Sequence, residues 1–360
     1  MDRLSWVGSL KVSSLVVAAA SGLLVSLAIS LMRRFASQAF ATDHPGERSS
    51  HVRPTARGGG IAIVAVVIAG LLLLAPQSVP PFTLLAAVGI ALISWLDDHR
   101  SLSAAVRLTA HGTAAVVAIV ECGPIEQMPL VGGNTLFLPP AVGFPLTFLW
   151  IVGLTNAYNF MDGIDGIAGL EGVIAGSSWA VAGALSLQPL PTWCGALLAG
   201  GCLGFLIHNW HPARIFMGDV GSAFLGYLFA VLPLVWRGAP AAGLAIGVLV
   251  VWPFVFDTVL TFIRRARAHQ PLLRAHRSHL YQRLVRTGLR HDSVTVLYAA
   301  LATSGGLLGI TWLSRPAFAA IVGPIAVTVL AMMLWLYVAI REKYCCTAPK
   351  GIARSKLELP

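Results

Sequence analysis

The amino-acid sequence predicts an all-α polytopic integral membrane protein. Of its 360 residues, 56% are hydrophobic and only 11% are charged, whereas a soluble domain carries about 25% charged residues. The mean hydropathy is +0.77. So few charged side chains cannot cover a globule in water, and a transmembrane helix needs only about 20 mostly apolar residues. The long apolar stretches of this chain therefore predict helices that cross a lipid bilayer.

About eleven apolar stretches approach the length of a transmembrane helix. The second and third are the shortest and could be tilted or re-entrant. The segments between them are too short for a soluble domain, so we expect one transmembrane domain at residues 1–345 and a cytoplasmic tail at 346–360. The eleven stretches lie at residues 13–32, 60–75, 82–96, 103–121, 142–158, 167–187, 192–207, 220–236, 241–263, 294–312 and 316–340.

The distribution of lysine and arginine predicts the orientation of these helices. With eleven spans, nearly all of the 25 basic residues fall on one side, and the exceptions are Arg3, Lys11, Arg237 and Arg315. The positive-inside rule makes the basic side cytoplasmic, which places the N-terminus in the periplasm and the C-terminus in the cytoplasm. Topology thus explains the net charge of +10 without a nucleic-acid partner. A cleavable signal peptide does not fit, because the first apolar run is too long.

The acidic residues and histidines gather on the predicted cytoplasmic side. They lie in or beside connections near residues 33–58, 97–102, 156–166, 208–219 and 264–292. A transporter or channel, which we keep as a remote alternative, is expected to place its charges near the midplane of the membrane. The one-sided pattern instead indicates a site that faces the cytoplasm.

Two adjacent carboxylates, Asp97 and Asp98, end the third apolar stretch. Acidic residues at a helix C-terminus oppose the helix dipole, and neighbouring carboxylates repel each other. A divalent metal ion would relieve both effects. The alternative is that the two residues are simply solvated at the end of a helix.

A second acidic motif joins two apolar stretches and contains Asn159, Asp162 and Asp165. The two aspartates share a face if the segment is helical, and Gly163 and Gly166 permit close backbone approach or positive φ. A helix cap could explain one aspartate. It would leave the second aspartate and the asparagine without a role.

The third motif brings Asn209, Phe216 and Asp219 into one short connection. Magnesium prefers one or two carboxylates together with water and phosphate oxygens, and Asp219 with Asp97 or Asp98 would supply these carboxylates. Phe216 could stack on a flat base, or it could be an interfacial anchor.

Two further segments carry arginine. The loop at 264–292 is arginine-rich and interleaves histidine, serine, tyrosine and glutamine. Arginine side chains suit phosphate oxygens, although a basic loop could also lie on anionic lipid. In the first loop, Arg57 precedes the glycines at 58–60, and such a glycine run before a helix can bind an anion.

Together these motifs resemble those of the polyprenyl-phosphate N-acetylhexosamine-1-phosphate transferases, glycosyltransferase family 4. The resemblance spans about residues 43–283, through the segments DHPGERSSH…GGG, WLDD, NAYNFMDGIDGIAG, HNWHPARIFMGDVGS and AHRSHLYQR. That superfamily includes the peptidoglycan translocase and the initiators of O-antigen and related glycans. The resemblance implies a helical bundle with a cytoplasmic cleft.

The resemblance also implies roles for individual residues. Asp97, Asp98 and Asp219 would be catalytic, with Asp97 deprotonating the lipid phosphate, and Asp219 and Asp98 would bind Mg²⁺, for which Mn²⁺ could substitute. The nucleotide, its sugar and its diphosphate would be held by Arg53, Arg57, Asn159, Asp162, Asp165, Asn209, Phe216, His276, Arg277, His279 and Arg283.

By the same resemblance, the expected reaction transfers a sugar-1-phosphate from UDP-GlcNAc, or from a 6-deoxy relative such as UDP-FucNAc or UDP-QuiNAc, to undecaprenyl phosphate. The HRSHLYQ form of the last motif is most similar to the O-antigen initiators that use 6-deoxy sugars. The first loop lacks the lysine of the translocase branch, and Arg53 or Arg57 would replace it. The expected location is the bacterial inner membrane, and a homodimer is left open. The alternative is a phospho-N-acetylmuramoyl-pentapeptide transferase.

Overall fold

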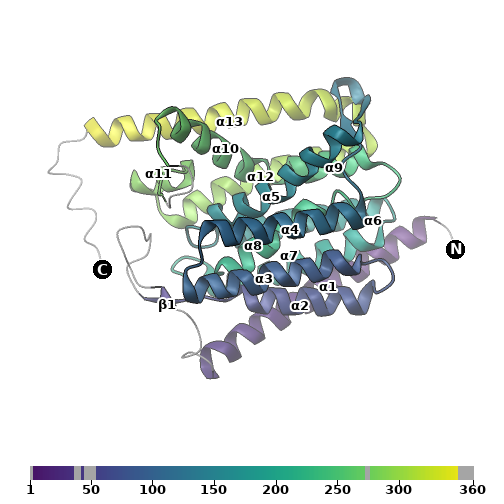
Figure 1. The fold of residues 1–360 in the computed structure, drawn as a ribbon, viewed down its shortest axis with the longest axis horizontal. Coiled ribbons are helices and arrows are strands. Elements are labelled where there is room, and N and C mark those ends of the chain that lie inside the picture. Colours follow the sequence, from purple (N-terminus) through teal and green to yellow (C-terminus); the bar gives the residue numbers. More distant parts are fainter. Residues whose placement is uncertain (1–2, 36–41, 44–53, 272–275, 348–360) are drawn as a thin grey trace.

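The computed structural model describes residues 3–35, 42–43, 54–271 and 276–347. Its helices lie side by side in one bundle, with α1 and α13 at opposite edges (Figure 1). In chain order the helices are α1 (Arg3–Phe35), α2 (Gly60–Leu74), α3 (Pro81–Arg100), α4 (Ala104–Cys122), α5 (Pro140–Met161), α6 (Ile167–Leu185), α7 (Pro189–Asn209), α8 (Asp219–Val231), α9 (Pro240–Val250), α10 (Trp252–Arg267), α11 (Leu280–Arg286), α12 (His291–Ser314) and α13 (Pro316–Thr347).

The bundle agrees with an all-helical membrane protein. Within the described residues, eight helices are long and apolar enough to cross a membrane, and the bent pair α9–α10 could be a ninth span. Helices α2 and α8 are also apolar but have only 15 and 13 residues, fewer than a full crossing requires. The eleven predicted stretches therefore correspond to these helices in order. A count of eleven spans and the orientation of the termini remain predictions.

The predicted span at 241–263 is built as two helices rather than one. Helices α9 and α10 meet at Val251 with a bend of 67°. Pro253 lies in the first turn of α10, where its missing N–H is tolerated and its fixed φ favours a helix start. The bend turns α10 along the wall of the cavity described below.

The centre of the bundle is enclosed by protein, and its periphery is apolar. Helices α6, α7 and α8 bury most of their length, around large side chains such as Trp179, Phe205 and Tyr227. Leu15 on α1, Leu73 on α2 and other apolar residues of the outer helices are exposed. Exposed apolar side chains on the outside of a helical bundle are what a lipid environment requires.

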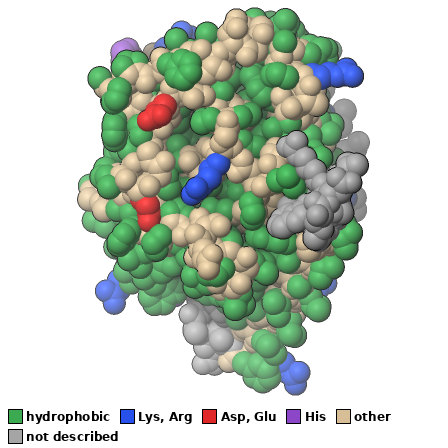
Figure 2. Space-filling view, turned by 90° about the vertical axis from the view of Figure 1, so that its right-hand side faces the viewer, with side chains coloured by type: hydrophobic (Ala, Val, Ile, Leu, Met, Phe, Trp, Pro, Cys, Tyr) green, Lys and Arg blue, Asp and Glu red, His purple; other side chains and the backbone are tan. Residues whose placement is uncertain are grey.

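Short strand pairs mark the two ends of the bundle. Strands β1 (Thr42–Asp43) and β2 (Thr55–Ala56) pair antiparallel at one end, and β3 (Gln127–Pro129) and β4 (Thr135–Phe137), linked by the 3₁₀ turn η2 (Val131–Gly133), pair at the other. Figure 2 views the β3–β4 end, which is mostly hydrophobic or neutral with scattered charges. The residues of the predicted site lie at the opposite end.

Candidate active site

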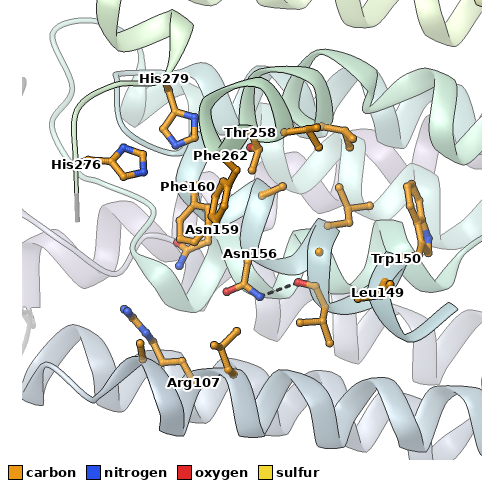
Figure 3. A pocket seen from close by; sticks show the side chains of 18 of the residues that line it. Arg107, Leu149, Trp150, Asn156, Asn159, Phe160, Thr258, Phe262, His276 and His279 are labelled. Atoms are coloured by element: carbon orange, nitrogen blue, oxygen red, sulfur yellow. Dashed lines mark hydrogen bonds between the residues drawn. The ribbon is translucent and has the colours of Figure 1, made fainter. Parts of the chain in front are cut away.

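A cavity of about 720 Å³ opens between α4, α5 and α10. Its two parts differ in character (Figure 3). One end carries polar side chains from four segments, and the other is an apolar arm that runs along the three helices. The polar residues are Arg107, Asn156, Asn159, Asp219, His276 and His279, and the apolar arm includes Leu149, Trp150, Val255, Val259, Phe262 and Ile263. The cavity can therefore hold a charged group and an apolar chain together.

Asp219 begins α8 and contributes its side chain to the polar end. The preceding Gly218 has φ +77°, and an added Cβ would lie 2.7 Å from the Asp98 Oδ2 atom, so this position requires glycine. The space lets Asp98 accept hydrogen bonds from the backbone N–H groups of Asp219 and Val220, at 3.2 and 3.4 Å. Asp98 thus caps α8, and the Asp219 side chain remains 28% exposed.

Arg107 links the other predicted carboxylates to the cavity. Its guanidinium donates to Asp97 Oδ2 at 2.7 Å and lies 3.9 Å from Asp219 Oδ2. Asp97 is buried, and its second oxygen accepts the N–H of Leu102 at 2.6 Å. Both oxygens of Asp97 are therefore occupied, and the geometry gives it the task of orienting Arg107. The sequence had not singled out Arg107 as a site residue. A proton-accepting role for Asp97 remains a prediction.

The glycine run of the first loop does not present its N–H groups to an anion. Gly58 and Gly59 donate to the carbonyl of Phe216, at 3.1 and 2.9 Å, and Gly60 donates to Met217 at 2.9 Å. The anion-binding expectation for this run is therefore wrong. Its role is to fasten the first loop to the α7–α8 connection, which brings the Arg57 guanidinium to 3.3 Å from Asp98 Oδ1.

Asn159 and Asp162 extend the polar end from the C-terminus of α5. The Oδ1 atom of Asn159 accepts the hydroxyl of Ser222 at 2.7 Å. Burial and the neighbouring Asp219 carboxylate raise the pKa of Asp162 to about 7. Burial and the Asp98 carboxylate raise the pKa of Asp219, at the start of α8, to about 7. Carboxylates that resist ionising together are the kind of group that a divalent cation stabilises.

These residues fit a magnesium ion. Magnesium takes one or two carboxylates and completes its shell with water and phosphate oxygens. Asp219 faces the cavity, and Asp162 is close enough to influence its charge. Asp98 lies beside them, although its oxygens already accept two backbone N–H groups and pair with Arg57. The donor set therefore suits Mg²⁺ at Asp219, with Asp162 or Asp98 as the second carboxylate.

Two predicted nucleotide-binding residues do not line the cavity. Asn209 is 4% exposed, and it accepts the N–H of Gly166 at 2.9 Å while donating to the Ile215 carbonyl at 2.8 Å. Asp165 Oδ2 accepts from His211 Nδ1 at 2.6 Å. Burial alone would raise the pKa of Asp165, but hydrogen bonds from His291 and His211 hold it below its usual value. Both residues tie together connecting segments at this end of the bundle.

The side chain of Asp257, which the sequence motifs did not identify, orients His279. Asp257 is fully buried on α10, and its oxygens accept from His279 Nδ1 at 3.2 Å and from the hydroxyls of Tyr298 and Thr261. It also accepts the N–H groups of the first two residues of α11. The Nε2 atom of His279 is thereby left for the cavity. A carboxylate inside an apolar stretch is itself a signal of function, and it could have identified Asp257.

The other residues of the last predicted motif differ in their surroundings. His276 lines the cavity, and burial together with His279, Arg265 and Arg264 lowers its pKa to about 4, so it is neutral at pH 7. Arg283 pairs through two nitrogens with Glu342 of α13. Among the described residues, neither Arg277, Arg283 nor Phe216 lines the cavity, and their substrate contacts remain predictions. Arg53 lies outside the described residues.

Tyr281 fixes this motif against the α5–α6 junction. Its hydroxyl donates to the Phe160 carbonyl at 3.0 Å. A Cβ at Gly163 would lie 2.0 Å from the same hydroxyl oxygen, so only glycine fits there. The Tyr281 hydrogen bond holds the segment with His276 and His279 against the segment that carries Asn159 and Asp162.

Known proteins are similar in sequence to this chain. The sequence profile of glycosyl transferase family 4 matches residues 81–237. The probable undecaprenyl-phosphate N-acetylglucosaminyl 1-phosphate transferase of Bacillus subtilis is 34% identical over 290 residues, covering 79% of this chain and 81% of that protein. The decaprenyl-phosphate N-acetylglucosaminephosphotransferase of Mycobacterium tuberculosis strain H37Rv is 31% identical over 341 residues, or 84% of each chain.

A third relative comes from another branch. The phospho-N-acetylmuramoyl-pentapeptide-transferase of Heliobacterium modesticaldum is 34% identical over 256 residues, covering 66% of this chain and 76% of that protein. The similarity to the first two relatives extends over most of both chains. The chain therefore belongs to glycosyl transferase family 4, the superfamily of polyprenyl-phosphate N-acetylhexosamine-1-phosphate transferases.

Proposed function

We propose that this protein transfers an N-acetylhexosamine-1-phosphate from a UDP-sugar to undecaprenyl phosphate and releases UMP. The observation that carries the proposal is the cavity, which joins a polar end at Asp219 and Arg107 to an apolar arm at Trp150 and Phe262. A polyprenyl phosphate has the same division between a charged head and an apolar chain. The relatives named for undecaprenyl and decaprenyl phosphate support this choice of acceptor.

In the proposed reaction an oxygen of the lipid phosphate attacks the β-phosphorus of the UDP-sugar. A new P–O bond forms, the bond from the β-phosphorus to the bridging oxygen breaks, and UMP leaves with that oxygen and its electron pair. Such transfers depend mainly on positioning and charge stabilisation. The lipid phosphate is already anionic, so a strong general base is not required.

The residues of the polar end suit this task. Arg107, held by Asp97, can bind phosphate oxygens in a fixed orientation. His279, held by Asp257, can donate from Nε2 to a phosphate or sugar oxygen. Asp219 would hold Mg²⁺, or Mn²⁺ in its place, and the bound ion supplies charge neutralisation for the diphosphate.

The proposed donor is UDP-GlcNAc or a 6-deoxy relative such as UDP-FucNAc or UDP-QuiNAc. The names of the B. subtilis and M. tuberculosis relatives support GlcNAc, and the HRSHLYQ motif supports a 6-deoxy sugar. The product would initiate O-antigen or another envelope glycan. The basic residues beside the polar end support a site facing the cytoplasm from the inner membrane.

The test is UMP release by detergent-purified protein with undecaprenyl phosphate, Mg²⁺ and a panel of donors. The panel contains UDP-GlcNAc, UDP-FucNAc, UDP-QuiNAc and UDP-MurNAc-pentapeptide. We expect release that requires both lipid and metal, and a preference for one of the first three donors. A preference for UDP-MurNAc-pentapeptide would place the protein with the H. modesticaldum relative instead. Folded protein that releases no UMP from any donor would contradict the proposal.

A further inference from the structure

Two histidines and an aspartate converge at the predicted cytoplasmic end, outside the lining of the cavity. Asp165 comes from the α5–α6 junction, His211 from the α7–α8 connection, and His291 is the first residue of α12. One carboxylate oxygen and the two Nδ1 atoms all lie within 4.8 Å of one another. Three chain segments that are far apart in sequence therefore direct metal-binding atoms at one point.

Hydrogen bonding accounts for only part of this arrangement. His211 Nδ1 makes a short bond to Asp165 Oδ2 at 2.6 Å. His291 Nδ1 lies 3.4 Å from the same oxygen and 3.4 Å from the Asp165 backbone nitrogen, which is beyond the usual range for a strong hydrogen bond. The His291 side chain is only 9% exposed. A buried imidazole nitrogen thus faces the cluster, and its two contacts with Asp165 are both long.

We propose that Asp165, His211 and His291 bind a divalent transition-metal ion, for which Zn²⁺ is the best fit. Two imidazoles and a carboxylate form a ligand set that zinc uses with a fourth, open position for water. Zinc–ligand bonds of about 2.0–2.1 Å place tetrahedral ligand atoms roughly 3.4 Å apart. The 3.4 Å pair already meets this spacing, and the 2.6 Å pair must open by less than about 1 Å.

The surroundings of the cluster support a metal site. The backbone N–H of Ala213 donates to Asp165 Oδ2 at 3.2 Å, and the Thr295 hydroxyl donates to the Asp165 carbonyl at 2.8 Å. Such outer contacts orient the ligands of a metal. His211 is 32% exposed, which gives the ion a route from solvent. Magnesium prefers oxygen ligands, so this site is chemically distinct from the one at Asp219.

A metal bound here would brace the polar end of the cavity. It would join the junction that carries Asp162 to the connection that carries Phe216 and Asp219, and both to α12. The inference is tested apart from the proposed transferase reaction, because metal binding is measured without donor or lipid.

Cobalt provides the direct test, because Co²⁺ replaces Zn²⁺ and absorbs visible light when bound by nitrogen ligands. Metal-free protein without a polyhistidine tag is titrated with Co²⁺, then with Zn²⁺, in excess Mg²⁺. We expect one Co²⁺ per chain, displacement by Zn²⁺, and a rise of several degrees in the thermal unfolding midpoint with Zn²⁺. A protein with no cobalt absorption and no zinc-dependent shift would overturn the proposal.

Matched variants separate a metal site from a purely structural cluster. His211→Gln and His291→Gln keep an N–H group for Asp165 but remove the imidazole, and each should weaken Co²⁺ binding at least tenfold. His269→Asn removes an exposed histidine outside the cluster and should leave binding unchanged. Wild-type Co²⁺ affinity in both glutamine variants would overturn the proposal. Should His291→Gln fail to fold, the more exposed His211→Gln carries the test.

Discussion

Asp162 and Asp165 belong to one motif, three residues apart, yet they lie in opposite environments. Asp162 faces other carboxylates, and its pKa is raised to about 7. Asp165 faces two histidines, and its pKa is held below the usual value. Asp219 and Asp257 differ in a similar way. The Asp219 side chain lines the cavity, whereas the buried Asp257 side chain accepts hydrogen bonds at both oxygens. Carboxylates that face each other suit a cation and substrate, and carboxylates that face donors hold the structure in place.

Asp219→Asn should have the largest effect, because it removes the cavity-facing carboxylate that the proposed Mg²⁺ requires. We expect turnover to fall by about 10²–10³-fold, the scale for losing one electrostatic contact at a transition state. The unfolding midpoint should stay the same or rise, since repulsion with Asp98 is relieved. UMP release and thermal unfolding measure the two effects. Near-wild-type turnover would remove Asp219 from the metal site.

Asp257→Asn tests the opposite class of carboxylate. We expect turnover to fall by about 10²-fold and the unfolding midpoint to fall as well, because the new amide group faces the N–H groups of Leu280 and Tyr281. The activity loss should act through His279, so adding His279→Gln to Asp257→Asn should lower turnover no further. A double variant that loses the full product of both single effects would show that the two residues act independently.

The raised pKa values of Asp162 and Asp219 predict a pH dependence of stability. An unfolded aspartate has a pKa of about 3.9, so the folded protein binds more protons between about pH 4 and 7. Linkage then makes the metal-free protein less stable as the pH rises through this range. The midpoint measured in EDTA should fall from about pH 5.5 to 8, and Mg²⁺ should restore most of the loss at the higher pH. Asp162→Asn should flatten the profile, and an unchanged profile in that variant would contradict the assignment.

Arg283→Ala should have the smallest effect. Its guanidinium is paired with Glu342, so we expect kcat/KM to change less than about threefold and stability to fall by at most about 1 kcal/mol, the scale for exposed ion pairs. Glu342→Ala is the matched control and should behave alike. A large activity loss in Arg283→Ala alone would support the substrate contact that the family resemblance implies.

The sequence predicted the helical membrane fold. Apolar length is a local property of the chain, and it predicted the helices in order, apart from α11 and the division between α9 and α10. The break at Val251 was missed because the apolar stretch continues through it, although Pro253 marks the start of a new helix.

The sequence could not predict which polar residues line the cavity and which hold loops together. Asn209 and Asp165 belong to motifs shared with the family, yet they contact other loops, and only the packing of distant segments reveals this. No sequence pattern distinguishes Arg107 from the other basic residues, and only the structure places it between Asp97 and Asp219. Asp257 stood alone in an apolar stretch, and its partner His279 is 22 residues away.

The apolar arm of the cavity has a consequence for how activity is measured. Leu149, Val259 and Ile263 line this arm and are 66%, 50% and 44% exposed on the outer surface of the bundle, so the arm opens sideways to the surrounding apolar phase. A lipid acceptor would arrive by two-dimensional diffusion and never leave that phase. Its effective concentration is then a mole fraction in the micelle or bilayer, and added detergent should slow the reaction by surface dilution while the nucleotide donor still follows bulk concentration.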